Sequence, residues 1–311
     1  MGKDEKRRLE IIYKESKLKP PYSKQSFVYR FWIFQNERIP LIVMAAIALS
    51  VTAAAARAND RFQWFQVTIA TLMIILYFLQ IRLADEPKDF EHDNEYYPDR
   101  PVQRGVITLK ELSHLKNGVV ASFLVLAALS GSWLVFGLAC LQQAYSYLTR
   151  KEFFIRDWLR KHFLTYQFSH YVQLFILAWL ILTVLNIQPL NDKFIYFAYV
   201  MLMIGMIESS RTVGGTDKSK AQDRYSYRLG IGVALASFAA FTLAVIGFTV
   251  FLIYRMQSNF GWLFLLIIGI LVVGWTIIRY EHKPITKNAE FLNGASLVMF
   301  LCSAMAILLS K

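Results

Sequence analysis

The sequence predicts an all-α, polytopic membrane protein built as a bundle of nine transmembrane helices, with its N-terminus in the cytosol. Hydrophobic residues make up 56% of the 311 positions. Apolar runs of about 20 residues recur along the chain, which is the length a helix needs to cross a bilayer. Lysine and arginine are concentrated in alternate connections between these runs, which is typical of a polytopic topology. We expect residues 1–311 to form a single transmembrane domain.

The chain begins with a polar, basic segment. We expect residues 1–26 to be a cytosolic tail that can lie on anionic lipid headgroups. The aromatic run from Phe27 to Phe34 fits either an interfacial helix or the start of the first span.

Nine spans follow from the apolar runs. They are expected near residues 39–57, 63–83, 116–131, 132–149, 164–187, 194–210, 229–254, 261–279 and 289–310. The third and fourth spans are separated only by Ser130-Gly131-Ser132, a small-residue break typical of a turn.

The basic residues orient this bundle. With nine spans, 29 of the 34 lysines and arginines fall on the side of the N-terminus, and the other five fall on the opposite side or at Lys311. The positive-inside rule then places the N-terminus and the even-to-odd connections in the cytosol. The net charge of +12 reflects this topology and an affinity for phosphate. It is not accompanied by a nucleic-acid-binding motif, so we expect no nucleic-acid partner.

Five carboxylates follow the second span, at the start of a polar connection over residues 84–115. They are Asp85, Glu86, Asp89, Glu91 and Asp93. On an ideal helix, positions 85, 86, 89 and 93 lie within roughly a quarter of the circumference. Pro87 lies inside this stretch, and we expect the helix to kink or end there.

Clustered carboxylates at a membrane boundary are costly and are usually kept for an ion or a substrate. The oxygens of Asp85, Glu86, Asp89 and Asp93 suit Mg²⁺ bound between the protein and substrate phosphates. Three arginines are candidates for the phosphates themselves: Arg82, Arg100 and Arg104. The alternative is a solvated, mixed-charge loop, and the regular spacing of the acids favours the functional interpretation.

A second polar cluster covers residues 208–228, between the sixth and seventh spans. Its carboxylates are Glu208, Asp217 and Asp223, and Arg211, Lys218 and Lys220 are suited to phosphate oxygens. A basic cytosolic loop explains the cations, but it does not explain Glu208 at the end of an apolar helix. A third polar site covers residues 151–157.

The stretch from Asp85 resembles the first aspartate-rich motif of the UbiA superfamily of intramembrane prenyltransferases, N-D-x-x-D-x-x-x-D followed by Pro-x-Arg-Pro-x-x-x-Gly. Asp85 stands at the Asn position and Glu86 at the first Asp, followed by Asp89 and Asp93. The second half of the motif is matched by Pro98, Arg100, Pro101 and Gly105. The second motif of the superfamily, D-x-x-x-D, has no counterpart in residues 208–228.

This resemblance implies an Mg²⁺-dependent enzyme that ionises an allylic prenyl diphosphate and transfers the prenyl group to a hydrophobic, aromatic or lipid-like acceptor. It implies catalytic roles for Asp89, Asp93 and Asp223, with Glu208 and Asp223 completing the metal site. Asn36, Arg38 and His170 are candidates for the acceptor pocket. For His170, a structural hydrogen bond is the favoured alternative. The expected location is a bacterial inner membrane or an intracellular eukaryotic membrane.

Two other functions stay open. The prenyl cation can close on its own double bonds, as in the terpene-cyclase members of the superfamily, because D-E-x-x-D also resembles the metal motif of class I terpene synthases. A membrane transporter is the second alternative, although its polar positions are expected near the bilayer midplane. The sequence contains no nucleotide-binding or zinc-protease motif.

Overall fold

The computed structural model describes residues 3–214 and 230–310, and the regular elements in this part of the chain are all helical. The all-α prediction is confirmed there. The α-helices are α1 (Lys3–Glu15), α2 (Phe27–Arg38), α3 (Leu41–Ala58), α4 (Trp64–Tyr96), α5 (Leu109–Leu129), α6 (Trp133–Arg150), α7 (Arg156–Lys161), α8 (Phe163–Val184), α9 (Leu190–Thr212), α11 (Ile231–Arg255), α12 (Phe264–His282) and α13 (Thr286–Ser310). Short 3₁₀ helices are η1 (Tyr22–Lys24), η2 (Glu152–Phe154) and η4 (Phe260–Leu263).

Seven of these helices are long and apolar enough to cross a membrane: α3, α4, α5, α9, α11, α12 with the preceding η4, and α13. The chain is therefore an integral multi-pass membrane protein. The other two predicted spans coincide with α6 and α8. The apolar part of α8 is shorter, at Phe168–Val184, and α6 contains polar residues such as Gln142 and Gln143. The count of nine spans stays a prediction.

The break between the third and fourth predicted spans is confirmed. Helix α5 ends at Leu129, and Gly131 adopts a φ of +71°, which a residue without Cβ tolerates well. Ser132 is the N-cap of α6, where its side chain accepts a hydrogen bond of 3.4 Å from the backbone N–H of Val135.

The N-terminal segment is more structured than the sequence predicts. Residues 3–15 form an amphipathic helix, since Leu9, Ile12 and Tyr13 are spaced to lie on one face. Ile12 is buried, and Leu9 and Tyr13 pack beside it. Helix α2 begins at the N-cap Ser26 and is separate from α3, so the aromatic run does not begin the first span.

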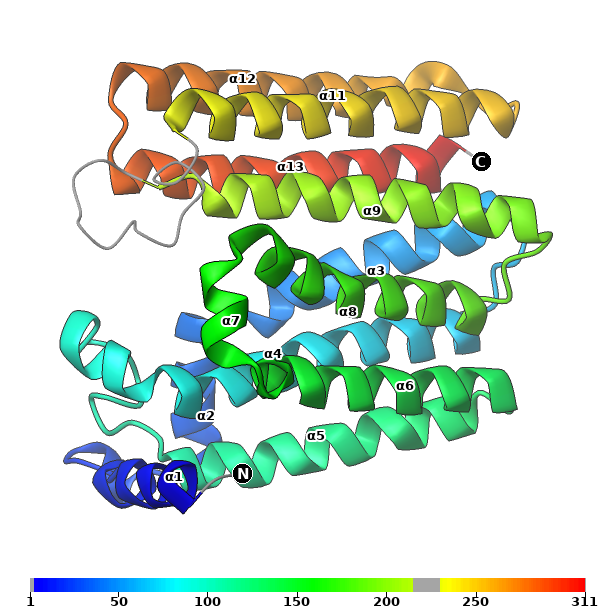
Figure 1. Ribbon diagram of the computed structural model, residues 1–311. Coiled ribbons are helices and arrows are strands. Elements are labelled where there is room, and N and C mark those ends of the chain that lie inside the picture. The colour runs from blue at the N-terminus through cyan, green and yellow to red at the C-terminus, as the bar shows by residue number, and fades with distance from the viewer. Residues whose placement is uncertain (1–2, 215–229, 311) are drawn as a thin grey trace. The chain divides into compact units, whose positions relative to one another are not determined.

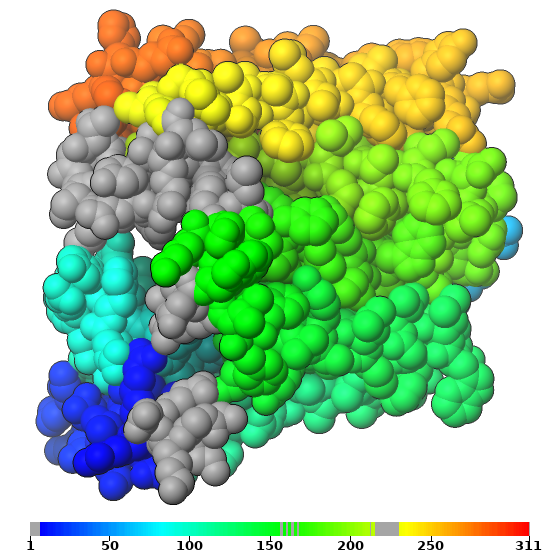
Figure 2. Space-filling view, viewed as in Figure 1, coloured from blue at the N-terminus to red at the C-terminus, as the bar shows by residue number. Residues whose placement is uncertain are grey.

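The chain forms two compact units. Unit 1 comprises Met1–Ala48 and Ile69–Leu180, and unit 2 comprises Leu49–Thr68 and Ile181–Lys311. The core of unit 1 joins the N-terminal helices to α4 and α5 (Figure 1). Its buried members are Ile12, Phe34, Ile39, Leu79, Leu83, Phe90, Val102, Ile107, Leu109, Leu112 and Val119. In Figure 2, the blue N-terminal surface lies directly against the cyan surface formed around the end of α4.

In unit 2, α9, α11, α12 and α13 run side by side, and α13 packs against the other three (Figure 1). Three buried hydroxyl groups connect α9, α11 and α13: Ser303 hydrogen-bonds both Tyr199 and Thr249. Such bonds join membrane helices where lipid offers no competing partner.

Candidate functional site

The acidic motif lies at the C-terminal end of α4. This helix has 33 residues and so extends for about 50 Å, well beyond the roughly 30 Å of the bilayer core. Its apolar part ends at Leu83, and the motif follows on the same helix. The helix does not end at Pro87, which lies inside it. The proline ring removes one backbone hydrogen bond from the helix. Glu86 and Phe90, on either side of Pro87, are buried and stabilise the helix.

Two of the four predicted metal ligands are buried counter-ions of arginines. Glu86 and Asp93 lie seven residues apart on one face of α4, and each is only 1% exposed. Arg38 from α2 reaches both carboxylates, at 2.8 Å from Glu86 Oε1 and 3.7 Å from Asp93 Oδ2. Arg82 binds Glu86 at 2.7 Å, and Arg100 pairs with Asp93. Three guanidinium groups therefore surround these two carboxylates.

The other two acids have no such partners. Asp85 and Asp89 lie one turn apart on α4 and are half-buried. Within the part of the chain that the structure describes, neither forms an ion pair within 4 Å or a hydrogen bond through its side chain. The motif is thus divided into a neutralised pair, Glu86 and Asp93, and a half-buried pair without an ion-pair partner among the described residues, Asp85 and Asp89.

The coordination that Mg²⁺ prefers is compatible with only part of this motif. No group of three or more acidic, histidine or cysteine side chains in the described residues is arranged to hold a metal ion, so an all-protein cage of four carboxylates does not fit. However, Mg²⁺ is commonly held by one or two carboxylates together with substrate phosphates and water. Asp85 and Asp89 fit that mode of binding.

The cluster also contains unsatisfied polar atoms. Glu86 Oε2 and Arg38 Nη2 are both buried without a hydrogen-bond partner among the described residues. Leaving such atoms unpaired costs free energy, and more so for charged groups. Arg38 Nη2 has a counter-charge in Asp93 Oδ2, at 3.7 Å.

The loop after α4 carries two of the predicted phosphate-binding arginines. Arg100 pairs with Asp93, and its guanidinium lies 4.0 Å from the centre of the Tyr97 ring. Arg104 instead binds Glu37 of α2 at 2.7 Å. The structure thus brings Arg82 and Arg100 to the acidic motif and holds Arg104 through α2.

A lysine inside the motif binds the third polar site of the sequence. Lys88 Nζ lies 3.1 Å from Glu152 Oε1, and the Glu152 side chain is only 4% exposed. Glu152, Phe153 and Phe154 all have positive φ values, of 47°, 52° and 60°. Non-glycine residues rarely adopt this conformation. Lys88 therefore has Glu152 as its ion-pair partner, and among the described residues it forms no ion pair within 4 Å with Asp85 or Asp89.

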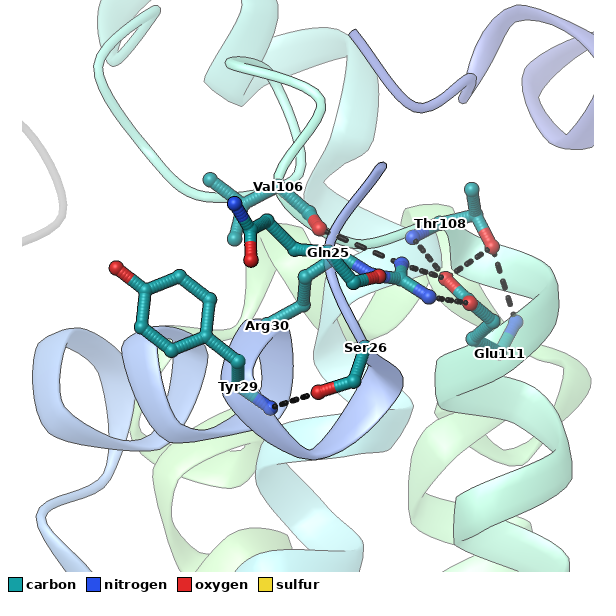
Figure 3. Close-up of polar contacts among 7 residues, drawn as sticks. All are labelled: Gln25, Ser26, Tyr29, Arg30, Val106, Thr108 and Glu111. Atoms are coloured by element: carbon teal, nitrogen blue, oxygen red, sulfur yellow. Dashed lines mark hydrogen bonds and ion pairs between the residues drawn. The ribbon is translucent and has the colours of Figure 1, made fainter. Parts of the chain in front are cut away.

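The start of α5 is fixed by a second arginine of α2 (Figure 3). Arg30 forms a bidentate pair with Glu111, at 2.6 and 2.9 Å, and its Nη1 also approaches the carbonyl oxygen of Val106. Glu111 completes a capping box with Thr108, the N-cap of α5. The loop from the motif to α5 is thereby anchored at its far end.

Two of the three predicted acceptor-pocket residues make local contacts. Asn36 accepts a hydrogen bond of 2.6 Å from its neighbour Gln35. His170 lies on α8, where its Nδ1 is 2.8 Å from the carbonyl oxygen of Tyr166 and its ring contacts the Tyr166 ring, with the centroids 4.3 Å apart and the planes tilted by 38°. This geometry fits the structural role of His170. Arg38, the third, instead binds Glu86 and Asp93 of the acidic motif.

The second polar cluster is only partly described. At the end of α9, Glu208 binds Arg211 at 2.6 Å, and Gly214 accepts a hydrogen bond from the hydroxyl of Tyr280. Asp217, Lys218, Lys220 and Asp223 lie outside the described residues, so their predicted roles stay predictions.

The sequence analysis did not assign Arg30, Glu37 or Lys88 to the site. One signal was available: charged residues inside a short aromatic helix need partners, and this applies to Arg30 and Glu37. Which acids they bind depends on tertiary packing and could not be deduced from spacing along the chain.

No protein-family model matches the chain, and a sequence search of curated proteins finds no match. Two solved structures share its fold. One, of digeranylgeranylglyceryl phosphate synthase in membranes, aligns with a TM-score of 0.57 and 14% identity, over 91% of this chain and 98% of the other. The second, an apo UbiA homologue from Aeropyrum pernix K1, aligns with a TM-score of 0.58 and 14% identity, over 85% and 96% of the two chains.

Proposed function

We propose that this chain, which has the fold of UbiA homologues, is an Mg²⁺-dependent intramembrane prenyltransferase. Its donor would be an allylic prenyl diphosphate, and its acceptor a hydrophobic aromatic or lipid-like molecule. The fold shared with a membrane synthase and a UbiA homologue supports this class of enzyme. The first half of the UbiA motif, from Asp85 to Asp93, supports the choice of a diphosphate substrate.

One observation carries the proposal. Asp85 and Asp89 are half-buried at the end of an apolar membrane helix and form no ion pair within 4 Å among the described residues, although Glu86 beside them is paired with two of the three arginines of the cluster. A structural ion-pair cluster would have neutralised all four acids. The free pair suits a divalent cation, and the nearby guanidinium groups suit phosphate oxygens.

Asp85 and Asp89 would hold Mg²⁺, whose bound charge stabilises the departing diphosphate. Arg82 and Arg100 lie at the edge of this site, and their N–H groups can donate to phosphate oxygens as negative charge develops on the leaving group. Because both arginines are already positioned by Glu86 and Asp93, little reorganisation accompanies this step.

In the proposed reaction, the allylic C–O bond breaks and its electron pair leaves with the diphosphate. The acceptor then supplies the electron pair that forms the new bond to the prenyl carbon, and it loses a proton. The apolar residues of α4 before Leu83 would hold the isoprenoid tail and keep water from the cation. The proposal also retains the predicted roles of Glu208, Arg211, Lys218, Lys220 and Asp223 in binding the metal or the diphosphate.

Terpene cyclisation is the second candidate, and the spacing Asp85-Glu86-x-x-Asp89 favours it. In that reaction the cation would close on its own double bonds without an acceptor. Transport is less well supported, because the charged cluster gathers at one end of α4 and not at its middle. For both enzymes, the charge asymmetry supports active-site loops on the cytosolic face.

Incubation of the purified protein with C10 to C20 prenyl diphosphates tests the proposal. The reaction is run with and without membrane extract, and the products are identified by mass spectrometry. Prenylated product that requires the extract and Mg²⁺ supports transfer, and a terpene formed without extract supports cyclisation. Absence of any diphosphate release with all chain lengths, in the presence of extract, contradicts both.

A further inference from the structure

We propose that the N-terminal helix α1 and the segment after it position the arginine-bearing loop of the diphosphate site. This loop, residues 97–108, connects the acidic motif to α5 and contains Arg100. Near one end of the loop, Arg100 pairs with Asp93. The other end is held by the capping box of Thr108 and Glu111 (Figure 3). The middle of the loop is held by the chain segment that the sequence suggests is a tail.

The first contact is apolar. Ile12 of α1 is 2% exposed and belongs to the same buried cluster as Phe90, Val102 and Ile107. Phe90 lies within the acidic motif, and the other two lie in the loop. Ile11, the neighbour of Ile12 in α1, is 48% exposed. One face of α1 therefore forms part of the core beneath the loop.

The second contact is made by residues 16–19, the segment that follows α1. The backbone N–H of Lys19 donates to the carbonyl oxygen of Gly105 at 3.1 Å, and Lys19 Nζ donates to that of Gln103 at 2.9 Å. Ser16 Oγ accepts a hydrogen bond of 2.9 Å from the backbone N–H of Leu109, one of the orphan donors at the start of α5. Three bonds therefore join residues 16–19 to the loop and its exit.

Gly105 shows how close this approach is. A Cβ at this position would lie 2.6 Å from Lys19 Cγ and 2.8 Å from both Lys17 O and Lys19 N, and the φ of Gly105 is +73°. Two of these neighbours are backbone atoms, which cannot rotate aside. The glycine of the Pro-x-Arg-Pro-x-x-x-Gly pattern is thus the point where the N-terminal segment contacts the loop.

An ion pair adds orientation at the rim. Arg8 Nε donates a hydrogen bond of 2.8 Å to Glu91 Oε1, and Arg8 Nη2 lies 2.7 Å from Glu91 Oε2, but the two side chains are 37% and 56% exposed. Exposed pairs contribute little to stability. Ile12 and Gly105 therefore dominate the docking, and Arg8 has the smaller effect.

This inference rests on the proposed function, since it assigns the docked segment to binding of the prenyl diphosphate. Displacing α1 would leave Arg100 on a loop with only its two ends fixed. Charge-assisted hydrogen bonds from arginine to phosphate depend on the placement of the guanidinium group. We therefore expect weaker substrate binding, with smaller effects on the chemical step.

Matched pairs of full-length variants test it. Ile12→Ala is compared with Ile11→Ala, and Gly105→Ala with Gly118→Ala, because a Cβ on Gly118 meets nothing within 4 Å. We expect Ile12→Ala and Gly105→Ala to raise the KM for the prenyl diphosphate by on the order of tenfold, with kcat changed by less than about threefold. The two controls should match the unaltered protein, and Ile12→Val should restore most of the affinity.

Hydrogen exchange of the same variants gives a readout independent of turnover. Amides of residues 100–109 should exchange faster in Ile12→Ala and Gly105→Ala than in their controls. Unchanged protection in both variants, or a loss of kcat with unchanged KM, overturns the inference. If the unaltered protein turns over no prenyl diphosphate, the proposed function fails, and the exchange data still report whether α1 holds the loop.

Discussion

At the scale of single residues, the main result is that four acids of similar appearance in the sequence have two different environments. Glu86 and Asp93 are buried against Arg38, Arg82 and Arg100, whereas Asp85 and Asp89 carry no ion pair within the described residues. The spacing predicted one acidic face of a helix, and it could not show which acids the arginines would neutralise. That depended on Arg38, which comes from a different helix.

Asp89→Asn tests the role of the unpaired acids. The change removes one negative charge, keeps the size of the side chain and leaves no buried cation unpaired. We expect diphosphate release to fall by about a hundredfold, as for other groups at a charge-developing centre, while thermal unfolding in detergent is unchanged. Near-normal turnover would contradict the proposed role.

Asp93→Asn should behave differently, although the sequence motif treats the two positions alike. It breaks a buried ion pair and leaves Arg100 without its counter-ion, whereas Arg38 keeps Glu86. We expect the free energy of unfolding to fall by about 3 kcal/mol, at the low end for buried pairs, because Arg100 reaches solvent. Unfolding curves of the two variants in the same detergent give the comparison. Equal stability of Asp89→Asn and Asp93→Asn would contradict the division of the motif.

At the scale of helices and loops, the sequence predicted what depends on local pattern. The break at Ser130-Gly131-Ser132 and the apolar part of α4 were identified correctly. Of the two outcomes predicted for Pro87, a kink or an end of the helix, the second is excluded because α4 continues to Tyr96. The docking of α1 was missed, since a short basic helix has too few apolar residues to signal burial until its partner surface is known.

Helix α9 carries the next prediction. Glu208 and Arg211 form an i, i+3 pair in which the Arg211 side chain is 58% exposed, and such pairs contribute roughly 0.5 kcal/mol or less. We therefore expect Arg211→Ala and Glu208→Gln to leave stability unchanged. A fall in affinity for a non-hydrolysable prenyl thiodiphosphate in either variant would then report a contact with substrate.

The two variants also have opposite implications. A larger loss in Arg211→Ala indicates a basic clamp on the diphosphate, and a larger loss in Glu208→Gln indicates a second metal ligand. Unaltered affinity in both would contradict the assignment of residues 208–228 to the site.

At the scale of the whole molecule, composition and hydropathy predicted a multi-pass helical protein, and the chain shares the fold of the two solved structures, one of them a UbiA homologue. The number of spans stays a prediction, because α6 and α8 combine apolar residues with polar ones, some of which bond to other helices. Tyr145 on α6, for example, donates a hydrogen bond to the carbonyl oxygen of Ser169 on α8.

Cysteine labelling tests the predicted topology. In a protein lacking Cys140 and Cys302, single cysteines are introduced at the exposed positions Asn94, Lys283 and Arg61. The charge asymmetry predicts that an impermeant reagent labels Asn94→Cys and Lys283→Cys only from the cytosolic side, and Arg61→Cys only from the other. Labelling of all three from one side would refute the predicted topology.

The most direct test of the central claim is calorimetric binding of a non-hydrolysable prenyl thiodiphosphate, with Mg²⁺ and with a chelator. The account predicts that removing Mg²⁺ weakens binding to the unaltered protein by at least about tenfold, which corresponds to 1.4 kcal/mol. In the double variant Asp85→Asn and Asp89→Asn, the affinity should be the same with and without Mg²⁺. Binding to the unaltered protein that does not depend on Mg²⁺, or a double variant that keeps the full dependence, would contradict it.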